Sequence, residues 1–288
     1  MENKRCLITG SSGFIGNAIC ERLKAGYDIL PLKQEDYYLP DFKSRLEEFN
    51  PQIIIHAAAY GNHSSQQDEM EMFEANVVKT LFLLHATKDI PYEAFINFGT
   101  SSEYGKKQIP MAETDLLEPV TLYGATKAAG TMLCRGFAKK YNKPIVTVRP
   151  FSVYGPGEAD FRFIPTVVRS LVRNEEFNLE PAAFHDWIYI DDLVEGVLTI
   201  IDKAKILSGI AVNIGMGKQY SNKEVVSMLE FISGKKAKIK EMPMRFNDSP
   251  VWVANNNLLI LCGWKPNVDL MVGLKRTYQY YKRLYENN

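Results

Sequence analysis

Short, almost continuous apolar runs alternate with longer amphipathic segments through most of the chain. Apolar runs this short are typical of parallel strands that are covered on both faces. The predicted strands are residues 5–9, 28–32, 53–56, 94–98, 145–149 and 211–214. We therefore expect a mostly parallel sheet at the centre of the molecule.

The segments between the strands have the spacing of amphipathic helices. Ile15, Ile19 and Leu23 recur at positions i, i+4 and i+8, which places them on one helical face. Gly26 follows as a stop signal. The other predicted helices are residues 74–87, 121–141 and 270–285. Strands that alternate with helices predict an α/β fold, a Rossmann-like doubly wound parallel sheet.

The second half of the chain is less regular. Gly155-Pro-Gly157 interrupts it after the fifth predicted strand. We expect a dinucleotide-binding domain at residues 1–154, to which residues 184–217 return. Residues 155–183 and 218–288 are expected to form a smaller C-terminal substrate-binding lobe.

Composition narrows the class of partner. The 288 residues carry a net charge of zero and no basic stripe, so neither nucleic acid nor an anionic membrane is an expected partner. No apolar run is long enough for a membrane span, and no leader is evident. The four cysteines are far apart and lack the CxxC spacing, which predicts free thiols, no metal site and a cytoplasmic protein.

A glycine-rich turn follows the first predicted strand and opens the first predicted helix. Gly10 permits a tight turn, Gly13 lets the backbone approach a pyrophosphate, and Gly16 lets the helix pack against the strand. The first amides of the helix would then face the anionic phosphates. The predicted cofactor loop consists of Gly10, Ser12, Gly13, Phe14, Ile15 and Gly16.

The residue after the second strand bears on the choice of dinucleotide. An enzyme that prefers NAD usually has an acid there for the ribose 2′-hydroxyl. In this chain the position falls on Lys33, which favours NADP(H) over NAD(H). Gln34, Glu35 and Asp36 follow at once, and a shift of one or two residues would restore an acid.

Tyr123 and Lys127 form the candidate catalytic pair. At i and i+4 of a predicted helix, their side chains lie on one face. A nearby positive charge favours phenolate, so we expect Tyr123 to ionise below its ordinary pKa. Such a tyrosine can exchange a proton with a hydroxyl or carbonyl oxygen.

With these two features in order, the chain resembles the extended short-chain dehydrogenase/reductase superfamily. It is most similar to the branch of nucleotide-sugar epimerases, dehydratases and reductases. The glycine loop and seven further ordered blocks within residues 1–217 carry the resemblance, which fades in the last 70 or so residues. Besides the glycine loop, these blocks are His56-Ala-Ala-Ala59, Glu74-Ala-Asn-Val77, Asn97 to Gly105, Pro119 to Lys127, Arg149 to Gly157, His185 to Leu193 and Asn213-Ile-Gly-Met-Gly217.

The resemblance implies hydride transfer between a nicotinamide and a sugar carbon. Tyr123 would exchange the proton on the reacting oxygen, Lys127 would lower its pKa and hold the nicotinamide ribose, and Thr100 with Ser101 would orient that oxygen. Further cofactor contacts are implied for Lys33, Ala57, Ala58, Ala59, Asn76, Tyr123, Lys127 and Pro150. Substrate contacts are implied for Ser102, Ser152, His185 and Asn213. A homodimer through the Tyr/Lys helix and its predecessor is also implied.

Departures from the family's blocks bear on the reaction. Sugar-nucleotide dehydratases have an acidic pair directly after the catalytic threonine, where this chain has Ser101-Ser102. Its acid, Glu103, is one residue later, and in a strand-like segment that slip turns the side chain to the opposite face. Ser152 and His185 replace an asparagine and an arginine of the family's substrate site.

Three reactions share this machinery. With dehydration disfavoured and Lys33 as the selector, we expect a reductase of a nucleotide-linked 4-keto sugar. The alternative is a nucleotide-sugar 4-epimerase or 4-oxidase with tightly bound NAD, and a 4,6-dehydratase ranks lower. A non-catalytic dinucleotide-binding regulator is the minor alternative, because such proteins usually lose the Tyr/Lys pair.

Overall fold

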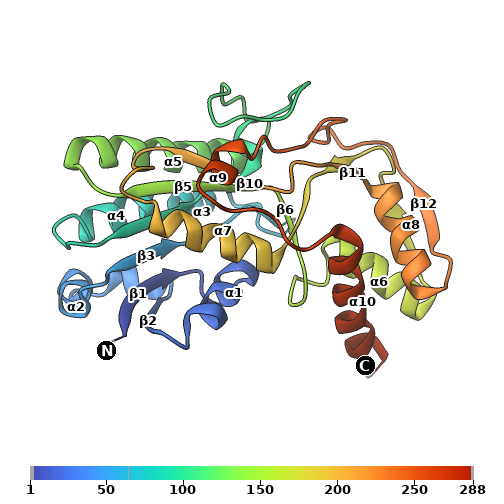
Figure 1. Cartoon of the computed structure of the whole chain (residues 1–288), viewed down its shortest axis with the longest axis horizontal. Helices are drawn as coiled ribbons and strands as arrows, with labels where there is room; N and C mark the ends of the chain where they lie inside the picture. The colour runs from blue at the N-terminus through green and yellow to red at the C-terminus, as the bar shows by residue number, and fades with distance from the viewer. Residues whose placement is uncertain (1–2, 64, 287–288) are drawn as a thin grey trace.

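In the computed structural model, a six-stranded parallel sheet forms the centre of the larger part of the molecule (Figure 1). Residues 3–63 and 65–286 are described, so the outer ends of the predicted domains at residues 1–2 and 287–288 lie outside the described residues. The strands, in their order across the sheet, are β2 (Tyr27–Leu32), β1 (Lys4–Thr9), β3 (Ile53–His56), β4 (Ala94–Phe98), β5 (Ile145–Pro150) and β10 (Ala211–Ile214). The predicted α/β class and parallel sheet are therefore confirmed.

The order of the strands creates a site at one edge of the sheet. The chain proceeds from β1 outward to β2 and then returns to the other side of β1 with β3. In open α/β sheets, ligands bind beyond the carboxyl ends of the strands at such a switch point. The segments that follow β1, β3, β4 and β5 all leave the sheet at this edge.

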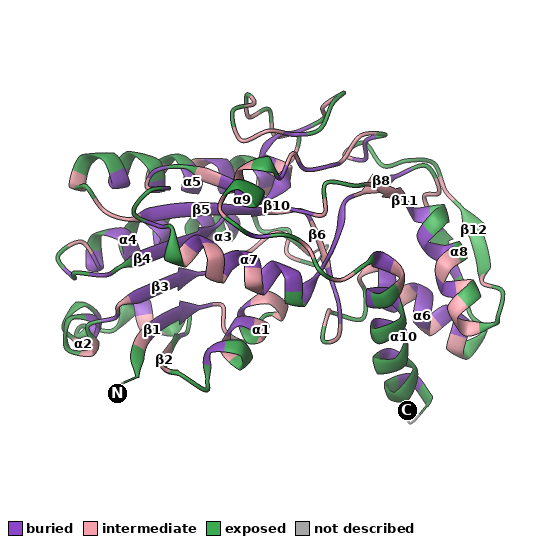
Figure 2. Ribbon diagram, in the orientation of Figure 1, coloured by how far each residue is buried: buried purple, intermediate pink, exposed green. Residues whose placement is uncertain are grey.

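Alternating residues of most of the sheet strands face two separate cores. In β1, Leu7 faces one core, while Cys6 and Ile8 face the other. The first core includes residues of α2 (Phe42–Phe49), α4 (Lys79–Ala86) and α5 (Leu122–Tyr141). The second includes α1 (Phe14–Leu23) and α7 (Ile190–Asp202) and continues into the smaller lobe. Both sheet faces are thus covered, which explains the continuous apolar runs of the strands. Figure 2 shows the inner strands β3 and β4 buried.

The helix predicted at residues 74–87 begins earlier and is not uniform. It starts as α3 (Glu69–Phe73), widens into a π-helical turn, η2 (Glu74–Val78), and continues as α4. Asp68 caps its N-terminus by accepting the amides of Met70 and Glu71, each at 2.9 Å. A π turn inside a helix is often found beside a functional site, and this one contains Asn76.

The smaller lobe is built mainly from three helices, α6 (Phe163–Arg173), α8 (Asn222–Ser233) and α10 (Leu270–Glu286), which pack on one another. Three two-stranded pairings accompany them. The short strands are β6 (Ser152–Tyr154), β7 (Glu176–Leu179), β8 (Phe184–His185), β9 (Trp187–Tyr189), β11 (Tyr220–Ser221) and β12 (Lys238–Glu241). The remaining short elements are the 3₁₀ turns η1 (Glu35–Tyr38) and η3 (Ser101–Glu103) and the helix α9 (Asn257–Leu261).

The chain returns once more to the larger domain before its last helix. Met111 and Ala254 form an isolated bridge, and α9 packs against β10. Part of the 218–288 segment therefore lies on the larger domain; the predicted domain boundaries stay a prediction. In the described part of the chain, no helix combines the length and apolarity that crossing a membrane requires, and all four cysteines are free.

Candidate active site

The glycine loop forms a close-packed turn with an open helix terminus. A Cβ atom on Gly10 would lie 2.7 Å from the Ala58 amide nitrogen, and the φ angle of Gly10 is +70°. Gly13 is the N-cap of α1, and no side chain caps this terminus. The first amides of the helix are therefore available to an anion. Ser12 is exposed, and Phe14 and Ile15 are half-buried beside it.

A chain of hydrogen bonds fixes the loop that follows β3. Thr9 Oγ1 lies 2.7 Å from His56 Nδ1 and accepts the Ala58 amide at 3.1 Å, while His56 Nε2 lies 3.0 Å from Thr80 Oγ1. Burial lowers the pKa of His56 to about 3, so this imidazole is neutral. Ala57 and Ala58 are held half-buried at the switch point, and Ala59 is exposed.

Asn76 fixes the same loop from the π turn. Its Oδ1 accepts the Tyr60 amide at 3.0 Å, and its Nδ2 donates to the Tyr60 carbonyl at 2.8 Å and to Thr126 Oγ1 at 3.0 Å. The side chain is buried and fully engaged. It therefore holds the loop after β3 and α5 together, and has no free amide atom for a direct cofactor contact.

The structure brings Tyr123 and Thr100 together, and Lys127 is buried in the helix that carries Tyr123. Tyr123 lies in the first turn of α5, whose N-cap, Thr121, accepts the Gly124 amide at 3.0 Å. Thr100 hydrogen-bonds the Tyr123 side chain from the end of β4. Lys127 is buried one helical turn further along α5.

The predicted direction of the Tyr123 pKa is wrong. Burial raises it to about 12, and this effect exceeds the lowering by the Arg162 charge and by the Thr100 hydrogen bond. Desolvation also lowers the pKa of Lys127 to about 8, although the Glu103 charge opposes it. In this form of the site the phenol is protonated, and Lys127 titrates near the physiological range.

The turn that carries Thr100 is not strand-like. Residues Ser101–Glu103 form η3, and Thr100 and Glu103 make a capping box around it: Ser102 N donates to Thr100 Oγ1 at 3.2 Å, and Thr100 N donates to Glu103 Oε1 at 2.9 Å. Ser101 is buried, and Ser102 is half-buried with its carbonyl against Gly124. Glu103 points inward and forms a buried ion pair with Arg149 at 2.9 Å. Its carboxylate is therefore turned away from the Tyr123 side, but the cause is the capped turn and not a one-residue slip in a strand.

Ser152 and His185 meet on the substrate side. Ser152 Oγ lies 3.2 Å from His185 Nδ1, and Pro150, half-buried at the end of β5, precedes this segment. Burial lowers the pKa of His185 to about 4, so it is neutral. The positive charge that the family's arginine would supply here is therefore missing from this position.

Two arginines that the sequence patterns did not indicate lie near these groups. Arg162, the N-cap of α6, is close enough to Tyr123 to lower its pKa. Arg245 acts on the pKa of His185 and is held by Asp248, with nitrogen–oxygen distances of 3.1 and 2.9 Å. The R-x-x-D spacing of Arg245 and Asp248 was the available signal, in the part of the chain where the resemblance fades.

Two further predicted residues lie differently from expectation. Asn213 is fully buried: its Nδ2 donates to the carbonyls of Met111 and Asn255, and its Oδ1 accepts the Tyr104 hydroxyl at 2.7 Å. It ties β10 to two loops and has no surface for a substrate. Lys33 is exposed on 73% of its side chain and lies 3.9 Å from Glu35, so its charge is partly offset.

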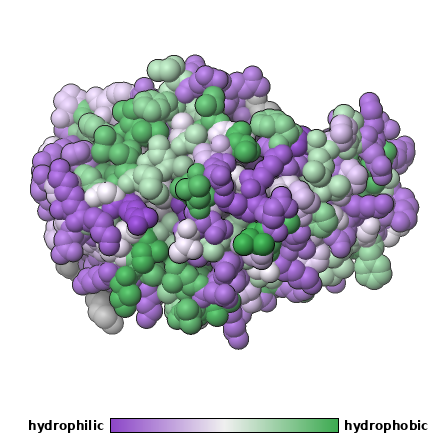
Figure 3. Space-filling model, turned by 90° about the horizontal axis from the view of Figure 1, so that it is seen from above, coloured by the Kyte–Doolittle hydropathy of each residue, from purple (hydrophilic) through white to green (hydrophobic). Residues whose placement is uncertain are grey.

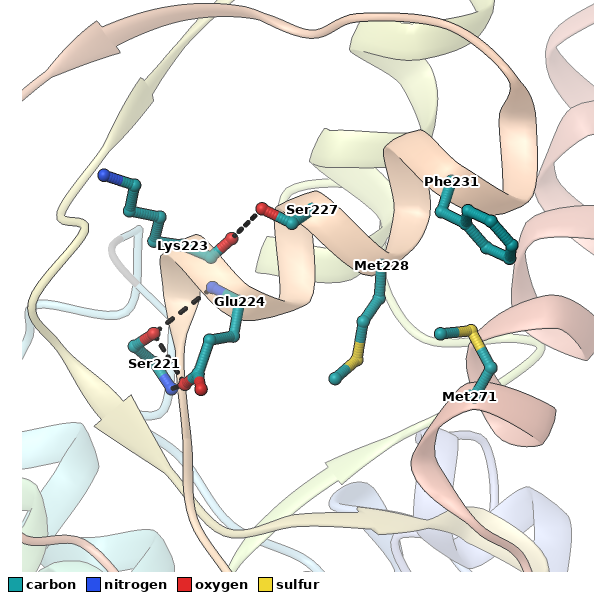
Figure 4. A pocket seen from close by; sticks show the side chains of 7 residues that line it. All are labelled: Ser221, Lys223, Glu224, Ser227, Met228, Phe231 and Met271. Carbon is teal, nitrogen blue, oxygen red and sulfur yellow. Dashed lines mark hydrogen bonds between the residues drawn. The ribbon is translucent and has the colours of Figure 1, made fainter.

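A hollow of about 470 Å³ lies in the smaller lobe, between α8 and α10, away from the Tyr/Lys pair. Figure 4 shows Met228, Phe231 and Met271 as its apolar side. Several of its polar groups bind one another: Ser221 and Glu224 form a capping box, and Ser227 Oγ donates to the Lys223 carbonyl at 3.0 Å. The charged side chain of Lys223 also lines the hollow.

Comparison with known proteins identifies the family. A profile of the NAD dependent epimerase/dehydratase family matches residues 6–215. A probable UDP-glucuronate 4-epimerase of Rhizobium meliloti is 30% identical over 98% of both chains. An uncharacterised UDP-glucose epimerase of Bacillus subtilis is 29% identical over 98% of this chain and 99% of its own.

Among solved structures, a mutant UDP-glucuronic acid 4-epimerase from Bacillus cereus is similar, with a TM-score of 0.90 and 28% identity over 98% of this chain and 100% of that one. It contains NAD and UDP-4-deoxy-4-fluoro-glucuronic acid, and two further structures of this epimerase also contain NAD. The preference for NADP(H) drawn from Lys33 is therefore wrong, because relatives of this kind hold NAD. Together with the fold, these matches show that the chain is an enzyme of the NAD-dependent epimerase/dehydratase family.

Proposed function

We propose that the enzyme is an NAD-dependent 4-epimerase that acts on a UDP-linked sugar. One observation carries the proposal: the site has a single proton-handling phenol, held by Thr100, while the acid of the same turn is locked in an ion pair. Such a site can oxidise and reduce a carbinol, but the turn offers no carboxylate for protons at C5 and C6.

The similar proteins support an epimerase better than the reductase expected from the sequence. The reductase preference depended largely on Lys33 as a selector of NADP(H), and that inference has failed. Relatives named as UDP-glucuronate and UDP-glucose epimerases cover almost the whole chain. The 4-epimerase alternative therefore replaces the reductase.

The residues around the glycine loop fit NAD. The open N-terminus of α1 suits the pyrophosphate, and a Cβ on Gly13 would meet only the Gly10 carbonyl, at 3.3 Å, so the loop is open on its other side. The loop at Ala57 and Ala58 borders the same edge. When bound there, NAD would supply reversible hydride transfer at sugar C4.

The chain's own residues handle the proton and orient the sugar. Tyr123 exchanges the proton of the C4 oxygen, and Thr100 donates a hydrogen bond that orients the same oxygen. Lys127, buried beneath, supplies positive charge when the phenol ionises. Since burial raises the pKa of Tyr123 to about 12, its phenol carries the proton that it would donate to the C4 oxygen.

The diphosphate of the substrate is assigned to Arg245. This guanidinium is preorganised by Asp248, and its side chain is half-exposed beside the neutral Ser152–His185 pair. A planar guanidinium matches phosphate oxygens well. Arg245→Gln is expected to raise the KM for the UDP-sugar at least about 10-fold, with a smaller effect on the affinity for NAD.

The proposal is tested with purified enzyme, NAD and a panel that includes UDP-glucuronate and UDP-glucose labelled with deuterium at C4. An epimerase converts one of them into its C4 epimer, retains the deuterium and produces no net NADH. Mass spectrometry of the denatured protein should identify NAD as the released dinucleotide. Consumption of NADPH with a 4-keto sugar, without any epimerisation, would reject the proposal in favour of a reductase.

We further propose a homodimer through α4 and α5. Apolar side chains are exposed on this surface; they include Phe73, Val78, Leu81, Phe82, Leu122 and Met132. Figure 3 shows hydrophobic patches on the face seen from above, on which α5 lies. Exposed patches of this kind mark protein–protein contacts. Light scattering should give twice the monomer mass, and Met132→Glu with Phe82→Glu should give the monomer.

A further inference from the structure

Glu103 is a buried carboxylate directly below the residues that handle the proton, and it takes no part in the proposed reaction. It is inaccessible to solvent. Its Oε1 accepts the Thr100 amide at 2.9 Å and the Thr131 hydroxyl at 3.0 Å, and its Oε2 accepts Arg149 Nε at 2.9 Å. These three donors offset the cost of burying the Glu103 charge.

These bonds connect the two elements that carry the reacting groups. Thr100 begins η3 after β4, whereas Thr131 lies on α5 four residues beyond Lys127, on the same helical face. One carboxylate oxygen therefore fixes the distance between the Thr100 turn and the Lys127 helix. A Cβ on Gly99 would overlap that oxygen, so the chain leaves room for it.

Arg149 holds the other carboxylate oxygen and continues the network. Its Nη1 donates to the Tyr104 hydroxyl at 2.9 Å, and that hydroxyl donates to Asn213. Glu103 thus cannot rotate towards the sugar without leaving the Arg149 guanidinium buried and unpaired. Glu103 therefore does not act as a catalytic acid, and its side chain stays fixed in the wall of the site.

We propose that Glu103 is a positioning residue, which holds Thr100 against Tyr123 and keeps Lys127 positively charged through a fixed carboxylate. The proposal rests on the proposed function for its kinetic consequence only. The structural part concerns the geometry and charge of the site and can be measured without any sugar.

The charged groups around Lys127 support an electrostatic role. On η3, Glu103 raises the pKa of Lys127 against desolvation. On α5, Tyr123 and Cys134 are protonated at neutral pH, because burial raises the pKa of each to about 12. On β3, His56 is neutral. Glu103 is therefore the anion that acts on Lys127 among these groups.

The main test compares Glu103→Gln with Glu118→Gln, a matched control whose carboxylate is exposed and pairs with Lys107 outside the site. Glutamine can still accept from Arg149, but its NH₂ group faces the Thr100 amide, donor against donor. NMR of Lys127, labelled with ¹³C at Cε and assigned with Lys127→Arg, should show titration near pH 8 in the native enzyme. In Glu103→Gln it should move down by about one pH unit, and in Glu118→Gln it should not move.

The kinetic readout is the split between kcat and KM. Glu103→Gln should lower kcat on the order of 10- to 100-fold with little change in KM, because Thr100 loses its alignment. If Glu103→Gln does not fold, Thr131→Val keeps the Arg149 ion pair and should lower kcat several-fold, whereas Thr131→Ser should restore it.

Unchanged titration of Lys127 and unchanged kcat in a folded Glu103→Gln protein would overturn the proposal, even if the thermal midpoint fell. So would native kcat in Thr131→Val where Glu103→Gln cannot be made. Native enzyme that epimerises no UDP-sugar would reject the proposed function instead. The Lys127 titration would still decide the role of Glu103.

Discussion

Alanine substitutions at Gly10 and Gly13 should separate the stability of the cofactor loop from its ability to bind NAD. A Cβ on Gly10 would lie 2.7 Å from Ala58 N and 2.8 Å from the Ala57 carbonyl carbon, against an ordinary contact of at least 3.4 Å. Both atoms belong to backbone that Thr9 and Asn76 hold in place. The clash cannot be relieved by turning a side chain.

The expected loss for Gly10→Ala follows from two effects. Overpacking of this kind costs about 1–3 kcal/mol, and a left-handed φ of +70° costs a residue with a Cβ about 1–2 kcal/mol more. The free energy of unfolding should therefore fall by roughly 2–5 kcal/mol. Urea unfolding of the NAD-free protein, followed by tryptophan fluorescence, measures it.

Gly13→Ala should behave differently. Its Cβ would meet the Gly10 carbonyl at 3.3 Å, and its φ of −76° suits any residue, so stability should change by less than about 0.5 kcal/mol. NAD affinity, measured by calorimetry, should nevertheless fall at least about 10-fold, or about 1.4 kcal/mol, because the methyl group stands where the pyrophosphate must approach. A Gly13→Ala protein that binds NAD like the native one, or a Gly10→Ala protein of native stability, would refute this reasoning.

Three further predictions concern the buried polar groups. Tyr123→Phe should lower kcat by about 10²–10⁴ in the epimerase assay, with NAD affinity largely kept; near-native turnover would exclude it as the proton-handling group. Arg149→Met should destabilise the fold by about 3–5 kcal/mol, because Glu103 is left buried without its partner, and urea unfolding measures this loss. Because the folded-state pKa of His56, about 3, is below its unfolded value of 6.5, its contribution to stability is present above pH 6.5 and is lost as pH falls towards 3. The slope should be up to about 1.4 kcal/mol per pH unit, and a His56→Gln protein with the native slope between pH 6.5 and 5 would contradict this.

The sheet could be predicted from the sequence because its strands are covered on both faces. β3, β4 and β10 have the predicted bounds, and the other three sheet strands differ by one residue at an end. Continuous runs such as Ile53-Ile-Ile are what a doubly covered parallel strand requires. The small lobe is harder to predict from the sequence, because its short strands lack such runs and its helices are placed by contacts between distant parts of the chain.

The turn at Thr100 has a signal in the sequence. Thr100-Ser-Ser-Glu103 has the T-x-x-E spacing of a capping box, which predicts a helical turn. The segment is a 3₁₀ turn, so the strand geometry expected for it is wrong. The side chain of Glu103 is turned away by the cap and by Arg149, a contact between residues 46 positions apart.

The pKa of Tyr123 could not be predicted from spacing. The i, i+4 relation to Lys127 gives proximity, but the ionisation of both groups depends on how much water the rest of the fold excludes. Desolvation favours the neutral form of both groups: it raises the pKa of the Tyr123 phenol and lowers the pKa of the Lys127 ammonium. Neither shift is visible in a helix taken alone.

Ser152 and His185, which replace the family's asparagine and arginine, contact each other. Ser152 and His185 hydrogen-bond each other as a neutral pair, so both replacements remove groups that the family directs at its substrate. A positive charge is still present nearby, on a different loop: Arg245 is held by Asp248, which is buried, and its charge acts on His185. Since a charge anchored by a buried carboxylate keeps its position without a ligand, the smaller lobe can present a preformed diphosphate site. The proposed diphosphate contact of Arg245 therefore lies in the part of the chain where the resemblance fades.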